Sequence, residues 1–195
     1  MQSEPTRNRI LDAARDLFDA EGEEGLSMRR IAGAVGITPM AIYRHYADKE
    51  ALKNALMLDG MAAWETRVEA IAATEPMAWV TGLGEAYLDF ALAEPRRYEA
   101  AFLLKASAAR QFPRDIEEGR SPALRSTIAR ITQAQASGLL IPAPPVQMAL
   151  HLAALMQGLV SMYRAGRFTE EAEFRAAYRR ALRHCLDSFR TETRP

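Results

Sequence analysis

Basic side chains gather in one short segment of this 195-residue chain. Residues 27–53 hold five basic side chains against two acidic ones, a net charge of +3; the basic ones are Arg29, Arg30, Arg44, Lys49 and Lys53. The preceding residues 12–24 hold six acidic side chains against one basic one, a net charge of −5. Because the whole chain has a net charge of zero, this local polarity predicts an oriented surface for a polyanion. It argues against a protein that coats nucleic acid uniformly.

The same segment predicts two short helices joined by a glycine turn. Ser27 is suited to cap a helix that runs to about Val35, and Gly36 can adopt the left-handed conformation that ends it. Thr38 then caps the next helix, with Pro39 at its first position. This arrangement is a helix-turn-helix, whose second helix enters the major groove of DNA.

A helix this short needs packing on one face, and its other face stays exposed. The residues expected to close a small core with a first helix ending near Gly22 are Leu26, Ile31, Val35, Ile37, Ile42 and Tyr46. Those expected at the surface are Thr38, Pro39, Met40, Ala41, Tyr43, Arg44 and His45.

The segment resembles the TetR family of one-component bacterial repressors over about residues 7–58. The resemblance rests on Gly25-Leu26-Ser27, Ile31-Ala32, Val35-Gly36-Ile37, Ile42-Tyr43-Arg44-His45-Tyr46 and Lys49-Glu50-Ala51-Leu52. It implies phosphate contacts for Ser27, Tyr43 and Lys49, and contacts with base edges for Arg29, Pro39, Met40, Ala41 and His45. Arg30 and Arg44 fit either role. The apolar trio from Pro39 to Ala41 suits thymine methyl groups, which leaves Arg29 as the expected guanine contact. Arg29 and Arg30 could equally be a solvated charge pair.

Helical spacing continues along the rest of the chain, so an all-α fold is expected. Helices are predicted from Asp48 to about Ala73, from Pro76, from Pro95, from Pro122 to near Gly138, from Val146 to Arg164, and after a cap at Thr169, with a loop containing one helical turn at 107–120. Gly60, within the first of these helices, is either a soft point or a site of tight packing. We expect a helix-turn-helix DNA-binding domain over residues 1–47 and a helical ligand-binding and dimerisation domain over 48–195.

In a TetR-like protein the second domain would hold a small-molecule effector. Twelve of the fifteen aromatic residues follow residue 55, together with several methionines, which favours an apolar or aromatic ligand. The expected pocket residues are Trp64, Trp79, Tyr87, Phe90, Phe102, Phe112, His151, Met156 and Tyr163. For any one of them, an ordinary core position is the competing interpretation.

The last two helices are predicted to pair with those of a second copy, as the resemblance implies. Small residues at near-helical spacing allow close approach, and the last helix has an apolar stripe. The expected interface residues are Ala154, Gly158, Ser161, Tyr178, Leu182 and Leu186. The alternative is that both helices are buried within one chain. A twofold dimer would read a palindromic operator with half-sites about 34–36 Å apart, or a multiple of that distance.

The function that these patterns favour is a ligand-released repressor that needs no cofactor. The sequence shows no strand-preceded phosphate loop, its three histidines form no metal-binding pattern, and Cys185 lies on an apolar stripe. The alternatives are a helical small-molecule-binding protein without specific DNA binding, and a small all-helical enzyme. A single cysteine and a polar N-terminus suggest the cytoplasm. The apolar stretch 146–163 is interrupted by polar residues, which favours a buried or interface helix over a membrane span.

Overall fold

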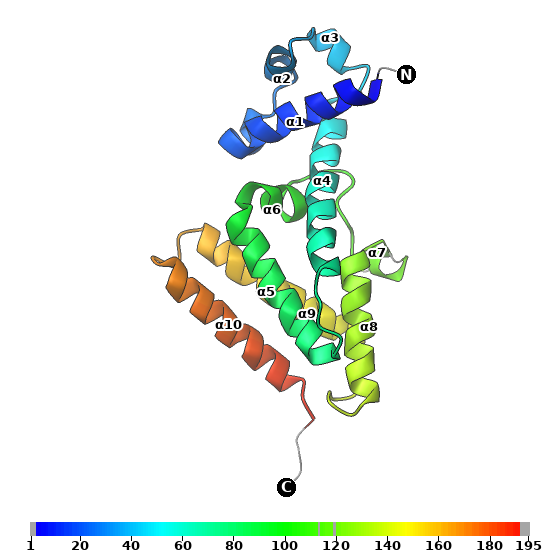
Figure 1. Ribbon diagram of the computed structural model, residues 1–195, viewed down its shortest axis with the longest axis vertical. Helices are drawn as coiled ribbons and strands as arrows, with labels where there is room; N and C mark the ends of the chain where they lie inside the picture. The colour runs from blue at the N-terminus through cyan, green and yellow to red at the C-terminus, as the bar shows by residue number, and fades with distance from the viewer. Residues whose placement is uncertain (1–2, 113, 119, 192–195) are drawn as a thin grey trace. The chain divides into compact units, whose positions relative to one another are not determined.

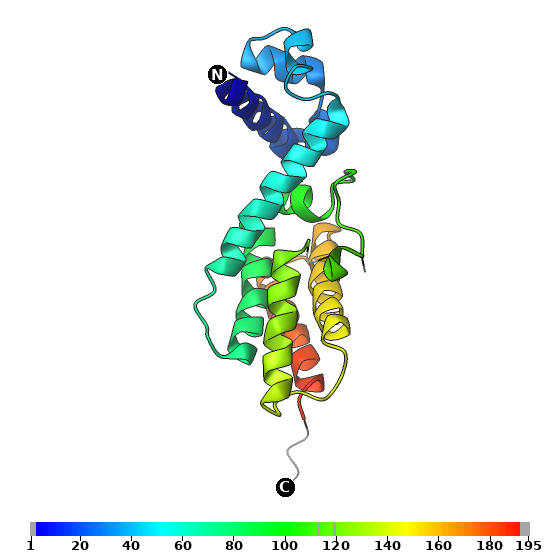
Figure 2. The same cartoon turned by 90° about the vertical axis from the view of Figure 1, so that its right-hand side faces the viewer.

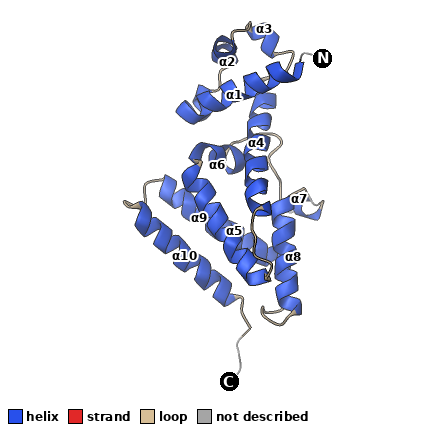
Figure 3. Ribbon diagram, viewed as in Figure 1, coloured by secondary structure: helices blue, strands red, loops and turns tan. Residues whose placement is uncertain are grey.

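The computed structural model describes residues 3–112, 114–118 and 120–191. Within these ranges the regular elements are helices, and the one additional feature is an isolated bridge between Leu140 and Arg190 (Figure 3). The predicted all-α class is confirmed. Backbone contacts divide the chain into two compact units. Unit 1 comprises Met1–Trp64 and Glu94–Ala109, and unit 2 comprises Glu65–Ala93 and Arg110–Pro195.

Unit 1 contains the helix-turn-helix segment and the helices that support it (Figure 1). Its elements are α1 (Ser3–Glu21), the 3₁₀ helix η1 (Gly22–Gly25), α2 (Met28–Val35), α3 (Pro39–Ile42), most of α4 (Lys49–Glu69) and α6 (Pro95–Phe102). One core joins them; its buried residues include Ile10, Ala14 and Phe18 of α1, Ile31 and Val35 of α2, Ile42 of α3, Leu52 and Leu56 of α4, and Ala100 of α6. Five of the six predicted core residues are buried, and Ile37 is half-buried. The sequence separation between α6 and α1 meant that no local pattern predicted their contact.

A charged residue of α4 links three helices of unit 1. The carboxylate of Asp59 forms ion pairs with the guanidinium of Arg15 of α1, at 3.1 Å, and with that of Arg97 of α6, at 3.2 Å. The next residue, Gly60, lies directly against α6: a Cβ atom there would lie 2.8 Å from the carbonyl oxygen of Arg97 and 2.9 Å from the backbone nitrogen of Ala101. Of the two interpretations of Gly60, the structure therefore supports tight packing.

Unit 2 is a helical bundle built around α5 (Pro76–Ala93). Its other helices are α7 (Arg114–Glu117), α8 (Pro122–Ala136), α9 (Pro145–Arg164) and α10 (Glu171–Ser188), together with the end of α4. Helix α5 packs against α8, α9 and α10, and α9 packs against both α8 and α10 (Figure 2). The Tyr178 hydroxyl of α10 donates to the carbonyl of Gly84 at 2.9 Å, and a Cβ atom at Gly84 would overlap Leu182. Gly84 therefore permits the close approach of α5 and α10.

Most predicted helix boundaries agree with the structure, and the differences have local causes. The prolines at 76, 95 and 122 each begin a helix, as expected. Helix α4 ends at Glu69, before the predicted Ala73. Helix α10 has Glu170 rather than Thr169 at its N-cap, without a side-chain cap bond. The predicted turn within 107–120 is α7, while residues 113 and 119 lie outside the described residues. The contacts group α4, as far as Trp64, with the preceding helices. The domain boundary expected at residue 48 stays a prediction.

Candidate nucleic-acid interface

The turn between α2 and α3 is closed by backbone hydrogen bonds. Gly36 has φ 73° and ψ 36°, the left-handed conformation that favours glycine. Its N–H donates to the carbonyl of Gly33 at 3.2 Å, and the N–H of Ile37 donates to that of Ala32 at 3.0 Å. The predicted glycine stop is thus confirmed.

Helix α3 begins as the sequence predicts and consists of four residues. The Thr38 Oγ1 atom accepts the N–H of Ala41 at 3.2 Å, and Pro39 occupies the first helical position. Regular helix ends at Ile42, and a turn follows through His45. Since Ile42 is completely buried, tertiary packing rather than helix length holds α3 in place.

The outer face of α3 has the exposure that the sequence predicts. Thr38, Pro39, Met40, Tyr43 and Arg44 are exposed, while Ala41 and His45 are half-buried. The exposed fraction is 71% for Met40 and 48% for Tyr43. This confirms the exposure of the face, and its contacts with DNA stay a prediction.

Helix α1 supports the two helices from behind. The Tyr46 hydroxyl donates to the carbonyl of Arg7 at 3.4 Å, and the guanidinium of Arg7 lies 5.1 Å from the centre of the Tyr46 ring. The Nη2 atom of Arg9 donates to the carbonyl of Val35, the last residue of α2, at 2.7 Å. Arg9 therefore satisfies a carbonyl that the end of α2 would otherwise leave open.

Two of the five basic residues of this segment are neutralised within unit 1. Arg30 forms a two-pronged ion pair with Glu21, at 2.5 and 2.6 Å, and this hydrogen bonding lowers the pKa of Glu21 and raises that of Arg30. Lys53 lies 2.8 Å from Glu23 and 3.7 Å from Glu50. The hydrogen bond from Lys53 lowers the pKa of Glu23.

The assignment of Lys53 to the basic surface was therefore wrong, because only 8% of this residue is exposed. No local pattern predicted this burial, because the ion-pair partner Glu23 belongs to a separate element, η1. The exposed basic side chains of this segment that form no ion pair within the described ranges are Arg29, Arg44 and Lys49. The unpaired positive charges thus lie on α2, in the turn after α3 and at the start of α4.

Ser27 occupies the N-cap position of α2 with extended backbone angles, as expected, but its side chain makes no cap hydrogen bond. The half-buried hydroxyl keeps its hydrogen-bonding capacity for a partner outside the helix. Ser27 and Lys49, together with the Tyr43 hydroxyl, are the polar groups from which we predict backbone phosphate contacts.

Two family models match this chain. The model described as bacterial regulatory proteins of the tetR family matches residues 10–56, and the model described as the tetracyclin repressor-like C-terminal domain matches residues 80–185. The second match alone covers more than half of the chain. The chain belongs to the TetR family.

The curated proteins that this chain resembles include a helix-turn-helix regulator. The chain is 28% identical over 99 residues to YobS of Bacillus subtilis, described as an uncharacterized HTH-type transcriptional regulator. The match covers 50% of this chain and 52% of YobS, so the chain spans about half the length of this curated relative.

Two solved structures show how widely the fold is shared. A protein of unknown function from Rhodococcus sp. RHA1 superposes with a TM-score of 0.77 at 24% identity, over 95% of each chain. AibR, solved in complex with isovaleryl coenzyme A and operator DNA, has a TM-score of 0.59 at 24% identity, over 82% of this chain and 86% of AibR.

The nine predicted effector residues of this TetR-family chain do not form one cluster. Trp64 and Phe102 belong to unit 1, where their rings meet edge to face at 5.9 Å. In unit 2, Trp79, Tyr87, Phe90 and Met156 are buried, and Tyr163 stacks on Phe174 at 4.3 Å. Phe112 and His151 are exposed. The pattern of aromatic residues therefore identified several parts of the cores rather than the lining of one pocket.

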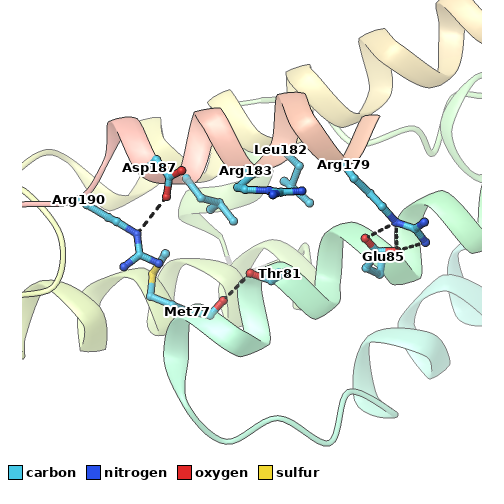
Figure 4. A pocket seen from close by; sticks show the side chains of 9 residues that line it. Met77, Thr81, Glu85, Arg179, Leu182, Arg183, Asp187 and Arg190 are labelled. Atoms are coloured by element: carbon cyan, nitrogen blue, oxygen red, sulfur yellow. Dashed lines mark hydrogen bonds and ion pairs between the residues drawn. The ribbon is translucent and has the colours of Figure 1, made fainter. Parts of the chain in front are cut away.

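A pocket in unit 2 lies between α5 and α10 and contains none of the nine (Figure 4). Its volume is about 180 Å³, and its lining residues are Met77, Thr81, Glu85, Arg179, Leu182, Arg183, Leu186, Asp187 and Arg190. This is smaller than a typical cavity for a drug-sized ligand, about 300–1,000 Å³. In the part of the chain that the structure describes, no three histidine, cysteine or acidic side chains converge as a metal site would require.

The six predicted interface residues fall into two groups. Ala154, Gly158 and Ser161 are exposed on α9. Tyr178, Leu182 and Leu186 of α10 are buried in the same chain, with exposed fractions of 0%, 3% and 6%. The apolar stripe of α10 therefore faces α5 and α9, so these three side chains are not available to a second copy.

Proposed function

We propose that this TetR-family chain is a ligand-responsive, DNA-binding transcriptional regulator that represses from a palindromic operator as a homodimer. The observation that carries the proposal is the exposed α3 face, which rests on a closed core, with exposed cations on the adjoining elements: Arg29 on α2, Arg44 after α3 and Lys49 at the start of α4. Exposed cations beside a short exposed helix suit a phosphate backbone and the adjoining major groove. The family is one of regulators rather than of enzymes.

Selection of bound duplexes from a random pool tests the DNA-binding part of this proposal. A recovered site with two inverted half-sites is expected, and its centre-to-centre spacing should be one helical turn or a multiple of it. Recovery of only unrelated sequences, with affinity that depends on length alone, would contradict specific recognition. That outcome would favour a helical small-molecule-binding protein without specific DNA binding.

The proposed dimer uses the outward face of α9. Its most apolar window has a mean hydropathy of 1.2, yet only 28% of that window is buried in the single chain. By length and composition alone such a helix could also cross a membrane, and the family assignment favours pairing with a second copy. A Cβ atom at Gly158 would meet nothing within 4 Å, so this side of the helix is open to a partner.

The dimer proposal predicts that Ala154→Arg produces a monomer, measured by light scattering after gel filtration. Ala129→Arg is the matched control, because Ala129 is exposed on α8. The control should remain dimeric. Dimerisation of Ala154→Arg with unchanged affinity would contradict the use of this face.

We further propose that a small apolar or aromatic effector releases the protein from DNA by binding among the α5 aromatics in unit 2. Trp79, Tyr87 and Phe90 are buried there, and the guanidinium of Arg67 lies 4.9 Å from the centre of the Phe90 ring. Since these rings are packed, a ligand can enter only if the bundle opens. The effector then shifts the equilibrium between the DNA-binding and the released conformation only as far as its affinities for the two conformations differ. AibR provides a precedent for a protein of this fold that was solved with both a small molecule and operator DNA.

A thermal-shift screen of hydrophobic compounds tests the effector proposal. A compound that raises the melting temperature should also weaken operator binding. If no compound does so in protein that still binds its operator, the effector proposal fails.

The single cysteine and the reducing environment that it suits support a cytoplasmic location as part of this proposal.

A further inference from the structure

The first turn of α3 presents apolar groups to solvent. Pro39 and Met40 are exposed and Ala41 is half-buried. At 71%, Met40 has the highest exposed fraction of the large apolar side chains among the described residues. The polar side chain at the start of this turn, Thr38, already uses its oxygen to accept the N–H of Ala41. The turn thus offers methyl, methylene and thioether groups where a helix would normally offer hydrogen bonds to bases.

Methionine 40 is not a misplaced core residue. The inward position of α3 is filled by Ile42, which has no exposed surface. Leaving a large apolar side chain in water is unfavourable, by about 25 cal/mol for each square ångström that a partner could cover. A partner for Met40 must therefore bring an apolar group to this place.

The surrounding charge identifies the class of that partner. Arg29 lies on α2, which packs against α3, Arg44 follows α3 directly and Lys49 begins α4; all three are exposed and form no ion pair within the described ranges. An apolar protein groove would leave these cations uncompensated, whereas a DNA duplex supplies phosphates around an otherwise polar groove.

The major groove contains one apolar group, the C5 methyl of thymine. Guanine, adenine and cytosine expose hydrogen-bonding edges there. Pressing Met40 against those edges would remove their water without replacing its hydrogen bonds, which is costly. A thymine methyl group is therefore the base feature that favours contact with this side chain.

We infer that each operator half-site carries a thymine opposite Met40, and that the first turn of α3 reads the thymine methyl group rather than a hydrogen-bonding edge. The inference rests on the proposed function, since it concerns the DNA that this same surface binds. Arg29 and the polar residues that follow Met40 then read or clamp the neighbouring positions.

Four duplexes test the inference directly. In the site selected from a random pool, the candidate thymine is replaced by deoxyuridine, by cytosine or by 5-methylcytosine. Loss of the methyl from thymine should weaken binding about fourfold in one half-site and about 15-fold in both. The duplex with 5-methylcytosine should bind more tightly than the duplex with cytosine, by a similar factor. Deoxyuridine in the flanking sequence is the control and should leave the affinity unchanged.

Two variants assign the effect to Met40. Met40→Ala should bring the ratio of affinities for thymine and uracil sites close to one, and Met40→Gln, of similar size, should do the same. Because the side chain is exposed, both variants should keep the melting temperature of the parent protein.

The possible failures are distinguishable. Equal affinity of the parent protein for thymine and uracil sites overturns the inference while leaving the proposed function intact. The same is true if Met40→Ala discriminates as well as the parent protein does. Failure to select any specific site overturns both.

Discussion

The ammonium group of Lys53 lies 2.8 Å from the carboxylate of Glu23, and only 8% of Lys53 is exposed. The pair joins η1 to α4, two elements on either side of the helix-turn-helix in the sequence. Carboxylate partners stabilise an ammonium group that is largely removed from water, so this ion pair helps to hold η1 against the start of α4.

We expect Glu23→Gln to lower the free energy of unfolding by about 0.5–1.5 kcal/mol, because the ion pair to Lys53 is lost, while Glu23 is itself partly exposed and Glu50 remains 3.7 Å from Lys53. Glu24→Gln is the matched control, since Glu24 is the exposed neighbour, and it should change the stability little. Urea denaturation at pH 7 measures both. Equal stabilities of the two variants would show that the ion pair contributes nothing.

The same pair predicts a pH dependence. Because Lys53 lowers the pKa of Glu23 from its usual value of 4.5, the contribution of Glu23 is fully present above that value. It is lost as the pH falls through the lower value of the folded protein. The stability difference between the parent protein and Glu23→Gln should therefore be constant from neutral pH to about pH 5 and should close below pH 4.5. A difference that persists unchanged at the lowest pH at which the protein folds would contradict this assignment.

Arg29 and Arg30 are adjacent but should behave differently. Arg29 is exposed without an ion pair in the described ranges, so Arg29→Ala should cost about 1–3 kcal/mol of specific binding and relax the preference at one base pair. Arg30 is held by Glu21, so Arg30→Ala should change operator specificity less. Affinities for single-base variants of the selected site measure both effects. A larger loss of specificity for Arg30→Ala would show that the ion pair opens on binding.

Lys49 should act through charge alone. We expect Lys49→Ala to weaken binding to all sequences alike and to reduce the slope of log affinity against log salt by about 1. Arg125→Ala removes the same charge from an exposed position on α8, and it should leave the slope unchanged. A slope for Lys49→Ala that equals that of the parent protein rejects the phosphate contact.

Gly60→Ala should destabilise the protein by about 1–3 kcal/mol, because the added methyl group must displace the backbone of α6. Gly33→Ala is the control: a Cβ atom there meets nothing within 4 Å, and alanine favours helix. That variant should be more stable by about 0.5–1 kcal/mol. Thermal denaturation distinguishes them, and a stabilised Gly60→Ala would show that α6 yields easily.

Local sequence signals were sufficient for the helix-turn-helix. Gly36, Thr38 and Pro39 specify a turn and a helix start through chemistry within three or four residues, and the structure confirms each. The same signals did not predict where α3 ends. After Ile42 the chain turns, with the N–H groups of His45 and Tyr46 bound to the Ile42 carbonyl, and the Tyr46 hydroxyl then reaches Arg7 of α1.

Long-range packing also explains why several of the sequence predictions of interface and effector residues failed. An apolar stripe on a helix shows that one face is covered, but not by which neighbour. Leu182 and Leu186 were therefore assigned to a partner chain although they lie in the interior of their own. For the same reason, aromatic composition could not distinguish a ligand cavity from two separate cores, and Trp64 and Trp79 were grouped although they belong to different units.

Unit 1 is assembled from two stretches of chain, Met1–Trp64 and Glu94–Ala109. During synthesis, the core beneath α3 therefore lacks Ala100 and Leu104 until about half of the polypeptide has left the ribosome. The same interleaving sets a rule for engineering. A chimaera that grafts only the first 56 residues onto another regulator would pair this α1 and α4 with a foreign α6. Transferring residues 94–109 along with the N-terminal stretch keeps that core complete.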